Sequence, residues 1–278
     1  GLRFRPASNS KWKANITAKT FTLLGGLLVL FLALPLAYFL AALSSSQLSL
    51  IGQPITLQAL GVSLLTATLA TALLALLGVP LGYLLARRDF PGKAILNVLV
   101  FLPLILPPAA SGIVLLLFFG PNQGLGSLLD AAGLQVVDNL AGIVLAQMFV
   151  SAPFVIVTSR AAFEAVPEVH EKISRTLGES ALVTFWRVAL PLARDGVIAG
   201  VIFAWMRSMG EFGATLVMAY HPYTLPVLMW VQLSGSGLSY ALPVVLLALL
   251  VTLIVLSLLF RFDPRADPLS RRGERGLG

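Results

Sequence analysis

The residues best suited to chemistry in this sequence are Arg207 and Glu211, which lie inside a long apolar run. They are four residues apart, so on a helix their side chains share one face. Each charge costs roughly 2.5 to 3.5 kcal/mol at the centre of a bilayer, so the pair should face protein or a water-filled path rather than lipid. Two interpretations stay open: a neutralised pair that fixes packing, or part of a permeation pathway. The mid-depth position favours the pathway.

The residues around the pair have the composition of a thin or broken helix. Gly210 and Gly213 would narrow the helix at this point or let it unwind. We therefore assign one short stretch as a permeation pathway or gate: Arg207, Ser208, Gly210, Glu211, Phe212 and Gly213.

Enzyme chemistry finds little support in the rest of the chain. The two histidines, His170 and His221, lie in different loops, and His170-Glu171 is not completed into a zinc-protease motif. There is no cysteine for a thiolate metal site or a disulfide, no Gly-x-Ser-x-Gly elbow and no Walker A loop. We predict no catalytic residue, no metal ligand and no cofactor bound by this chain; an ATP site, if transport uses one, lies on another chain.

Composition places the chain in a membrane. Of its 278 residues 58% are hydrophobic and 11% charged, and the mean hydropathy is +0.92, whereas soluble domains carry about 25% charged residues. The formal charge of +7 could suggest nucleic-acid binding. We reject that interpretation because the basic residues sit in short loops between apolar runs, where they determine topology.

Six apolar runs reach the roughly 20 residues that a helix needs to cross a bilayer. We expect an all-α polytopic protein with these runs as its transmembrane helices: Phe21 to Leu43, Leu57 to Ala86, Ala94 to Phe119, Leu140 to Ser159, Asp195 to Ala219 and Tyr240 to Phe260. Pro103, Pro107 and Pro108 remove backbone donors from the third run, so it should kink or line a cavity.

Loop charges orient these runs. Lysines and arginines fill the segments before the first run, after the sixth, and between the second and third and the fourth and fifth. The alternate loops, 44–56, 120–139 and 220–239, contain neither. By the positive-inside rule both termini are cytoplasmic. We expect a cytoplasmic N-terminal segment (1–20), a six-helix membrane domain (21–260) with a cytoplasmic loop (161–194), and a cytoplasmic tail (261–278).

The outer loops give a weaker signal. Residues 120–139 combine turn-forming and apolar residues, which suits a short interfacial helix. Residues 220–239 contain Tyr223 and Trp230, and such side chains are typical of the water–lipid boundary. An interfacial anchor is therefore favoured over a docking surface for an external partner.

The longest polar interruption, Glu164 to Pro191, is predicted to form two short helices. Pro167 suits a first helical position, Gly178 ends the first helix, and Ser180 caps the second. On the second helix Leu182, Trp186 and Ala189 should share a face, with Phe185 beside them. A hairpin carrying a Phe and a Trp between membrane spans is typical of a part that docks onto a partner.

This hairpin resembles the cytoplasmic "EAA" loop of the permease subunits of ABC importers. Gly178 takes the glycine of that motif, Val188 the isoleucine position, and Leu190-Pro191 the Leu-Pro. The sequence departs from the motif where Lys172-Ile173-Ser174 replaces Glu-Ala-Ala, with Glu171 one residue early. The resemblance implies contacts with an ATPase through Glu171, Arg175, Leu177, Gly178, Leu182, Phe185, Trp186, Leu190 and Pro191.

A narrower resemblance concerns the stretch from Arg207 to Thr215, followed by Thr224-Leu225-Pro226. It is similar to the fifth-span signature of molybdate and tungstate permeases, and sulfate and thiosulfate permeases carry a related stretch. The resemblance implies an ATP-driven importer of a tetrahedral oxyanion in a prokaryotic inner membrane, working by alternating access. Molybdate or tungstate is favoured, a sulfate or thiosulfate permease comes second, and a secondary anion transporter is less favoured, since Glu211 is the only carboxylate near mid-depth.

The same resemblance implies the assembly. It consists of a second copy of this chain, two ATP-binding subunits on the cytoplasmic side that hold ATP and Mg²⁺, and an extracytoplasmic oxyanion-binding protein. The lipid bilayer surrounds it, and no nucleic acid takes part. The chain itself would be no enzyme, although the whole complex would hydrolyse ATP. The short tail also leads us to expect no regulatory domain.

Overall fold

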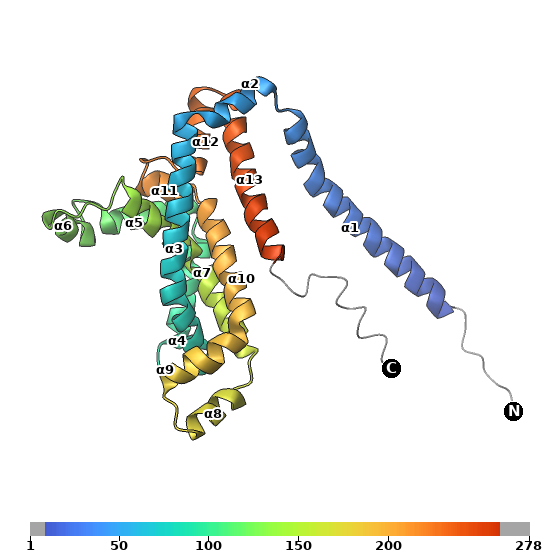
Figure 1. Ribbon diagram of the computed structural model, residues 1–278, viewed down its shortest axis with the longest axis vertical. Coiled ribbons are helices and arrows are strands. Elements are labelled where there is room, and N and C mark those ends of the chain that lie inside the picture. The colour runs from blue at the N-terminus through green and yellow to red at the C-terminus, as the bar shows by residue number, and fades with distance from the viewer. Residues whose placement is uncertain (1–8, 262–278) are drawn as a thin grey trace. The chain divides into compact units, whose positions relative to one another are not determined.

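The computed structural model describes residues 9–261, and within that range it is entirely helical (Figure 1). It divides into two units, Gly1–Ser49 and Leu50–Gly278. Most of the predicted tail, and the first eight residues of the predicted N-terminal segment, lie outside the described residues. The predicted division into segment, membrane domain and tail therefore remains a prediction.

The first unit contains α1 (Asn9–Ala41) and α2 (Ser45–Leu48), and the short 3₁₀ helix η1 (Ser49–Gly52) follows. Within α1, residues Lys19–Ala41 are long and apolar enough to cross a membrane. This stretch corresponds to the first predicted span. The helix itself begins at Asn9, so the polar residues ahead of the apolar run belong to the same helix.

The second unit holds the remaining helices. In chain order they are α3 (Pro54–Arg87), α4 (Lys93–Ile105), α5 (Pro108–Phe119), α6 (Gly124–Ala131), α7 (Leu140–Glu164), α8 (Val169–Thr176), α9 (Ala181–Thr184), the π-helix η2 (Phe185–Ala189), α10 (Leu190–Met209), α11 (Gly213–Met218), α12 (Leu225–Gly235) and α13 (Leu238–Arg261). The predicted interfacial helix of the loop 120–139 corresponds to α6.

Among the described residues, five helices are long and apolar enough to span a membrane, and there are six candidate spans if a bent pair of helices counts as one. The bent pair is the third predicted span. There the chain bends by 118° between α4 and α5, because Leu106 precedes Pro107 and takes an extended conformation that ends α4. The all-α, multi-span architecture is confirmed, whereas one continuous third helix is wrong.

The fifth predicted span is also interrupted. Helix α10 ends at Met209, residues 210–212 leave the helix, and α11 starts at Gly213. A further difference is α12, which occupies most of the predicted loop 220–239 and buries Leu225, Val227 and Leu228. The sequence predicted an interfacial anchor here from Tyr223 and Trp230, whereas the apolar residues of this stretch form a packed helix.

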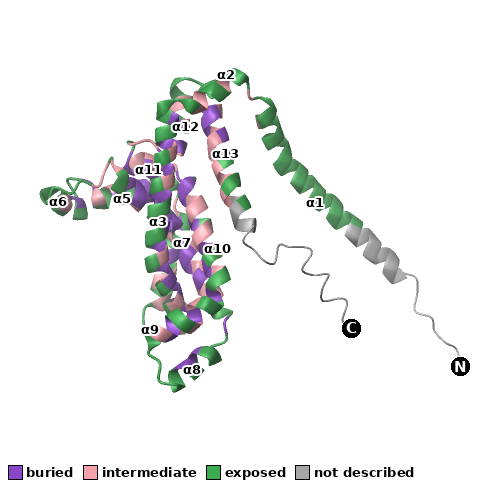
Figure 2. Cartoon of the chain, viewed as in Figure 1, coloured by how far each residue is buried: buried purple, intermediate pink, exposed green. Residues whose placement is uncertain are grey.

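Helix α7 is the centre of the second unit, and much of its surface is buried against its neighbours (Figure 2). Two Gly-x-x-x-Gly motifs, Gly78 to Gly82 in α3 and Gly196 to Gly200 in α10, face it. A Cβ on Gly82 of α3 would lie 2.9 Å from the carbonyl oxygen of Ile156, and one on Gly200 of α10 would lie 2.9 Å from Cβ of Thr158. Only glycine admits backbones at this separation, so these residues bring α3 and α10 onto the same stretch of α7, residues 154–162.

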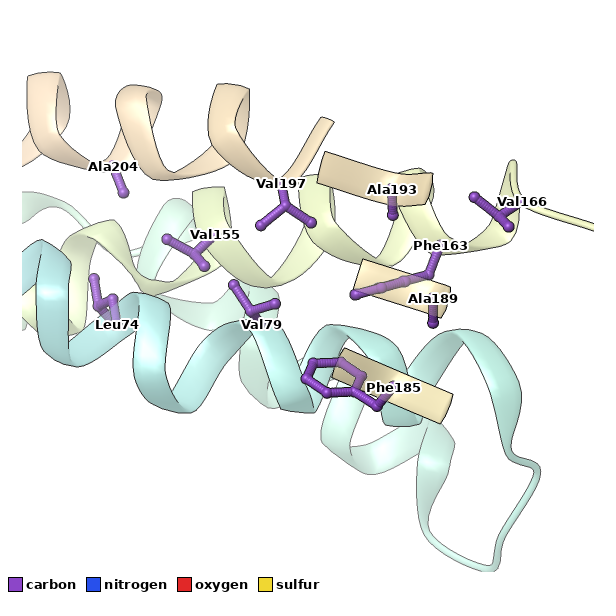
Figure 3. Close-up of a cluster of buried hydrophobic side chains, with 10 residues drawn as sticks. All are labelled: Leu74, Val79, Val155, Phe163, Val166, Phe185, Ala189, Ala193, Val197 and Ala204. Carbon is purple, nitrogen blue, oxygen red and sulfur yellow. The ribbon is translucent and has the colours of Figure 1, made fainter. Parts of the chain in front are cut away.

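A cluster of buried apolar side chains fills the space between these helices (Figure 3). Leu74 and Val79 come from α3, Val155 and Phe163 from α7, and the others from the segment that follows α7. The cluster continues to Phe185 and Ala189 of η2, so the membrane core and the base of the hairpin form one packed body.

Substituting Gly82 by alanine should destabilise the protein. The added Cβ overpacks the contact with α7, and such overpacking lowers the free energy of unfolding by about 1–3 kcal/mol. The matched control is Gly61→Ala in the same helix, where no heavy atom lies within 4 Å of the added Cβ. That change should raise stability by about 0.5–1 kcal/mol through backbone entropy. Thermal unfolding of the detergent-purified protein measures both, and shifts of equal sign would contradict the prediction.

Candidate functional site: a helical hairpin and a buried ion pair

The predicted hairpin is present, and local sequence shapes it. Gly178 separates α8 from α9 with a backbone φ of +93°, a conformation that favours glycine. The hydroxyl of Ser180 accepts a hydrogen bond from the amide of Val183 at 3.3 Å, so Ser180 caps α9 as predicted. Helix α8 starts two residues beyond Pro167. At its start Lys172 hydrogen-bonds Glu168 at 3.1 Å, and this bond, with the charge of Lys172, lowers the pKa of Glu168.

Inside the hairpin, Glu171 is held by residues that sequence reasoning missed. Its Oε1 accepts a hydrogen bond from Nε of Arg87 at 2.7 Å, and its Oε2 accepts one from the hydroxyl of Tyr83 at 2.6 Å. The side chains of Arg87 and Glu171 are each 8% exposed. Glu171 therefore bonds within its own chain. The available signal was Arg87 itself, a basic residue at a helix end that sequence analysis used only to orient the protein.

Phe185 also lies inside the chain rather than on its surface. Its ring centroid is 5.0 Å from that of Tyr83 and 6.0 Å from that of Phe163 on α7. Ala189 is fully buried as well, whereas Leu182 and Trp186 are 68% and 58% exposed. The expected common face of Leu182, Trp186 and Ala189 is therefore wrong. The π-helical turn causes the difference, since the amide of Leu190 bonds the carbonyl of Phe185, five residues back.

The outer side of the hairpin carries two rows of exposed apolar side chains, which we call the hairpin rows. The first row is Val169 and Ile173 on α8 and Leu177 just after it, spaced four apart; the second is Leu182 on α9 and Trp186 on η2, also four apart. Arg175 and Pro191 are exposed, and Leu190 is half-buried. Large exposed apolar side chains at regular spacing mark an interaction surface.

The second predicted site lies where α10 breaks. Arg207 is in the last turn of α10, and its guanidinium forms an ion pair with Oε2 of Glu211. The other carboxylate oxygen, Oε1, accepts a hydrogen bond from the amide of Ala214 at 2.8 Å. The Glu211 side chain is 0% exposed and that of Arg207 is 27% exposed. Glu211 thus satisfies a free amide at the start of α11 while Arg207 balances its charge.

The neighbouring pathway residues also take part in this break. Ser208 donates a hydrogen bond to the hydroxyl of Ser151 on α7 at 2.9 Å. The rings of Phe212 and Trp230 lie 5.7 Å apart. A Cβ on Gly213 would lie 2.7 Å from Cβ of Pro108, at the start of α5, so the breaks in the two interrupted spans touch each other.

This arrangement limits the chemistry of the pair. Oε1 of Glu211 accepts a hydrogen bond and Oε2 is ion-paired with Arg207, so the carboxylate is occupied mainly in holding this break together. Among residues 9–261 the structure has no group of three or more His, Asp or Glu that could hold a metal ion. The guanidinium of Arg207, whose side chain is partly exposed, is the part of the site that could attract an anion.

Comparisons with known proteins identify relatives over most of the chain. A family model described as "binding-protein-dependent transport system inner membrane component" matches residues 78–268. A probable molybdenum ABC transporter permease of Haloferax volcanii is 43% identical over 81% of this chain and 82% of its own. A molybdate/tungstate transport system permease of Pyrococcus abyssi is 40% identical over 82% of this chain and 88% of its own.

Two further comparisons concern substrate and fold. A probable sulfate transport system permease of Chlorokybus atmophyticus is 31% identical over 65% of each chain. The crystal structure of a bacterial alginate ABC transporter, in complex with a periplasmic protein carrying an alginate pentasaccharide, contains a chain similar in fold. The TM-score is 0.66 over 93% of this chain and 96% of that one, at 13% identity, so the likeness concerns the fold alone.

Removing one partner of the intramembrane pair should cost more than neutralising both. Arg207→Met leaves the buried Glu211 carboxylate unpaired, which destabilises a protein by about 3–5 kcal/mol. The double variant Arg207→Met/Glu211→Gln keeps an acceptor for the Ala214 amide and has no unpaired charge, so it should regain most of that loss. Thermal unfolding in detergent measures both variants. If the double variant is less stable than Arg207→Met, the assigned role of the pair is wrong.

Proposed function

The chain belongs to the family of binding-protein-dependent transport system inner membrane components; it is an importer permease subunit, and we propose that its cargo is molybdate or tungstate. One observation carries the choice of cargo. Identity reaches 43% and 40% with relatives named for molybdenum or for molybdate and tungstate, over four fifths of the chain. With the sulfate relative it is 31% over about two thirds. Sulfate is therefore the second candidate.

The partners follow from the surfaces of the chain. The hairpin rows fit an apolar cleft on an ATP-binding subunit, which would hold the ATP and Mg²⁺ because this chain has no Walker A loop. A homodimeric permease would carry two such subunits, one at each hairpin. An extracytoplasmic protein would bind the oxyanion and deliver it from the opposite side.

The site of action is the inner membrane of a prokaryotic cell, with both termini and the hairpin in the cytoplasm. The distribution of lysine and arginine supports this orientation. Arg87, Arg160 and the hairpin carry positive charge at one end of the helices, whereas the loops at the other end lack it.

The geometry suggests how ATP would drive transport. When the ATPase dimer closes, each hairpin moves with it as a lever. Phe185, packed against Phe163 and Tyr83, carries that movement into the membrane core. The helices rock between inward-open and outward-open states, which is alternating access.

Within the pathway, Arg207 would attract the oxyanion while Glu211 shapes the broken helix. Because Glu211 is bound to Arg207 and to the Ala214 amide, it acts as a gate or packing residue and does not bind the anion. The external binding protein supplies the selectivity, so weak binding in the pathway allows rapid release.

Trp186→Ala and Leu182→Asp should abolish copurification of the ATP-binding subunits, because each change removes part of the apolar hairpin surface. We expect at least about a tenfold loss of affinity, as for interface residues that dominate binding. The matched control is Leu134→Asp, which alters an exposed leucine in the loop between α6 and α7. Affinity copurification measures the loss, and full recovery of the ATPase with both hairpin variants would contradict docking at this surface.

Molybdate and tungstate, delivered by the cognate binding protein, should stimulate ATP hydrolysis by the reconstituted complex, whereas sulfate should not. Arg207→Ala should lower molybdate uptake per folded, reconstituted complex, because the pathway loses its attraction for an anion. Uptake of the labelled anion into proteoliposomes tests both expectations. Stimulation by sulfate alone would make the chain a sulfate permease, and normal uptake by Arg207→Ala would restrict Arg207 to packing.

A further inference from the structure

The hairpin is joined to the membrane helices by two routes. One is covalent, since α9 and η2 continue directly into α10. The other is the contact of Glu171 with Tyr83 and Arg87 at the end of α3. Tyr83 and Arg87 both lie more than 80 positions before Glu171 in the sequence. Their contact connects α8, which otherwise packs mainly on α9 and η2, to the long apolar helix α3.

The second route has the geometry of a rigid joint. Nε of Arg87 bonds Glu171, and its Nη2 donates a 2.8 Å hydrogen bond to the carbonyl oxygen of Val166, where the chain leaves α7. The planar guanidinium is thereby fixed at two points. Because both charged side chains are almost completely buried, water cannot replace either bond without opening the site.

Tyr83 contacts three neighbouring elements, α7, α8 and η2. Its hydroxyl bonds Glu171 on α8, while its ring packs edge-on against Phe163 of α7 and Phe185 of η2, with centroids 5.1 and 5.0 Å apart. One side chain of α3 therefore touches both halves of the hairpin and the central helix. Tyr83 and Arg87 are four residues apart, on one face of α3.

Nearer its other end, α3 makes a second contact, with α12. The hydroxyl of Ser63 accepts a 2.8 Å hydrogen bond from the amide of Leu225, at the start of α12. Ser63 and Arg87 are 24 residues apart in one continuous helix, which corresponds to about 36 Å at 1.5 Å per residue. Helix α3 thus connects the hairpin to α12 near the opposite end of the bundle (Figure 1).

We infer that Tyr83 and Arg87 are positioning residues that make the hairpin and α3 move as one body, so that movement of the hairpin reaches α12 through α3. The inference rests on the proposed function, in which an ATP-binding subunit docks on the hairpin rows. It adds that α10 alone does not carry the movement. Breaking the joint should leave docking intact and separate ATP hydrolysis from transport.

The primary test uses three variants of the full complex in proteoliposomes with the loaded binding protein. Tyr83→Phe removes one hydrogen bond and keeps the ring packing. Arg87→Gln removes the positive charge, whereas Arg87→Lys keeps the charge and loses the planar guanidinium that bonds both Glu171 and Val166. The matched control, Arg160→Gln, breaks a different ion pair, that of Arg160 with Glu164 at the end of α7, and the hydrogen bond from Arg160 to Asn97 on α4, so it leaves α8 and α9 untouched.

The readout is the amount of anion transported per ATP hydrolysed. We expect Arg87→Gln to lower this ratio about tenfold, a typical coupling factor. Tyr83→Phe and Arg87→Lys should lie between it and the native complex, and Arg160→Gln should match the native complex. The ATP-binding subunits should copurify with all four variants, because the hairpin rows are untouched. A native ratio for both Tyr83→Phe and Arg87→Gln would overturn the inference.

A distance measurement separates movement from stability. The chain has no cysteine, so spin labels on Arg88→Cys, just beyond α3, and Lys172→Cys, on α8, report only those two sites. In the native joint the distance between labels should stay the same with and without ATP, whereas in Tyr83→Phe it should broaden or shift by several ångströms. A nucleotide-dependent distance in the otherwise native chain would overturn the inference even if uptake falls.

Failure of the inference and failure of the proposed function give different results. If native coupling persists in all joint variants while Trp186→Ala still loses the ATPase, the joint is unnecessary and the importer assignment stands. If Trp186→Ala and Leu182→Asp retain the ATPase, the docking surface is elsewhere and the proposed function has failed in that part.

Discussion

The close approach of α3 and α10 to α7 is the constraint on which the rest of the structure depends. In a bilayer there is no hydrophobic force between helices, so association comes from van der Waals packing and hydrogen bonds. Glycines on α3 and α10 supply that packing by removing the side chains that would hold the backbones apart. The hairpin base, with Phe185 and Ala189, is then packed in the same apolar cluster.

Because α7 is fixed between two neighbours, irregular backbone elsewhere can be tolerated. The third and fifth predicted spans both break at residues that limit the number of unsatisfied backbone amides. Glu211 accepts from an amide at the start of α11, and Pro107 and Pro108 have no amide hydrogen to satisfy. The ion pair of Arg207 and Glu211 is thus part of the way the chain interrupts this helix.

The sequence predicted the helical class, the apolar spans and the hairpin, including the break at Gly178 and the helix cap at Ser180, because each depends on local composition or periodicity. It could not predict which helices the Gly-x-x-x-Gly motifs face, nor the contact of Glu171 with Arg87 and Tyr83, since these depend on pairing between distant segments. The common face of Leu182, Trp186 and Ala189 failed because a helix of 3.6 residues per turn was assumed where the structure has a π-helical turn. Helix α12 was missed because its flanking turn residues concealed a short apolar run.

The contact between the two broken spans bears on how such a protein can evolve. A Cβ on Gly112 of α5 would lie 2.8 Å from Cβ of Val217, and one on Gly213 would lie 2.7 Å from Cβ of Pro108. Each glycine thus faces a bulkier residue of the other span, so neither span can acquire a larger side chain there unless its counterpart shrinks. In an alignment of related permeases, positions 108, 112, 213 and 217 should therefore covary as a group, although the two positions of each contacting pair lie more than a hundred residues apart in sequence.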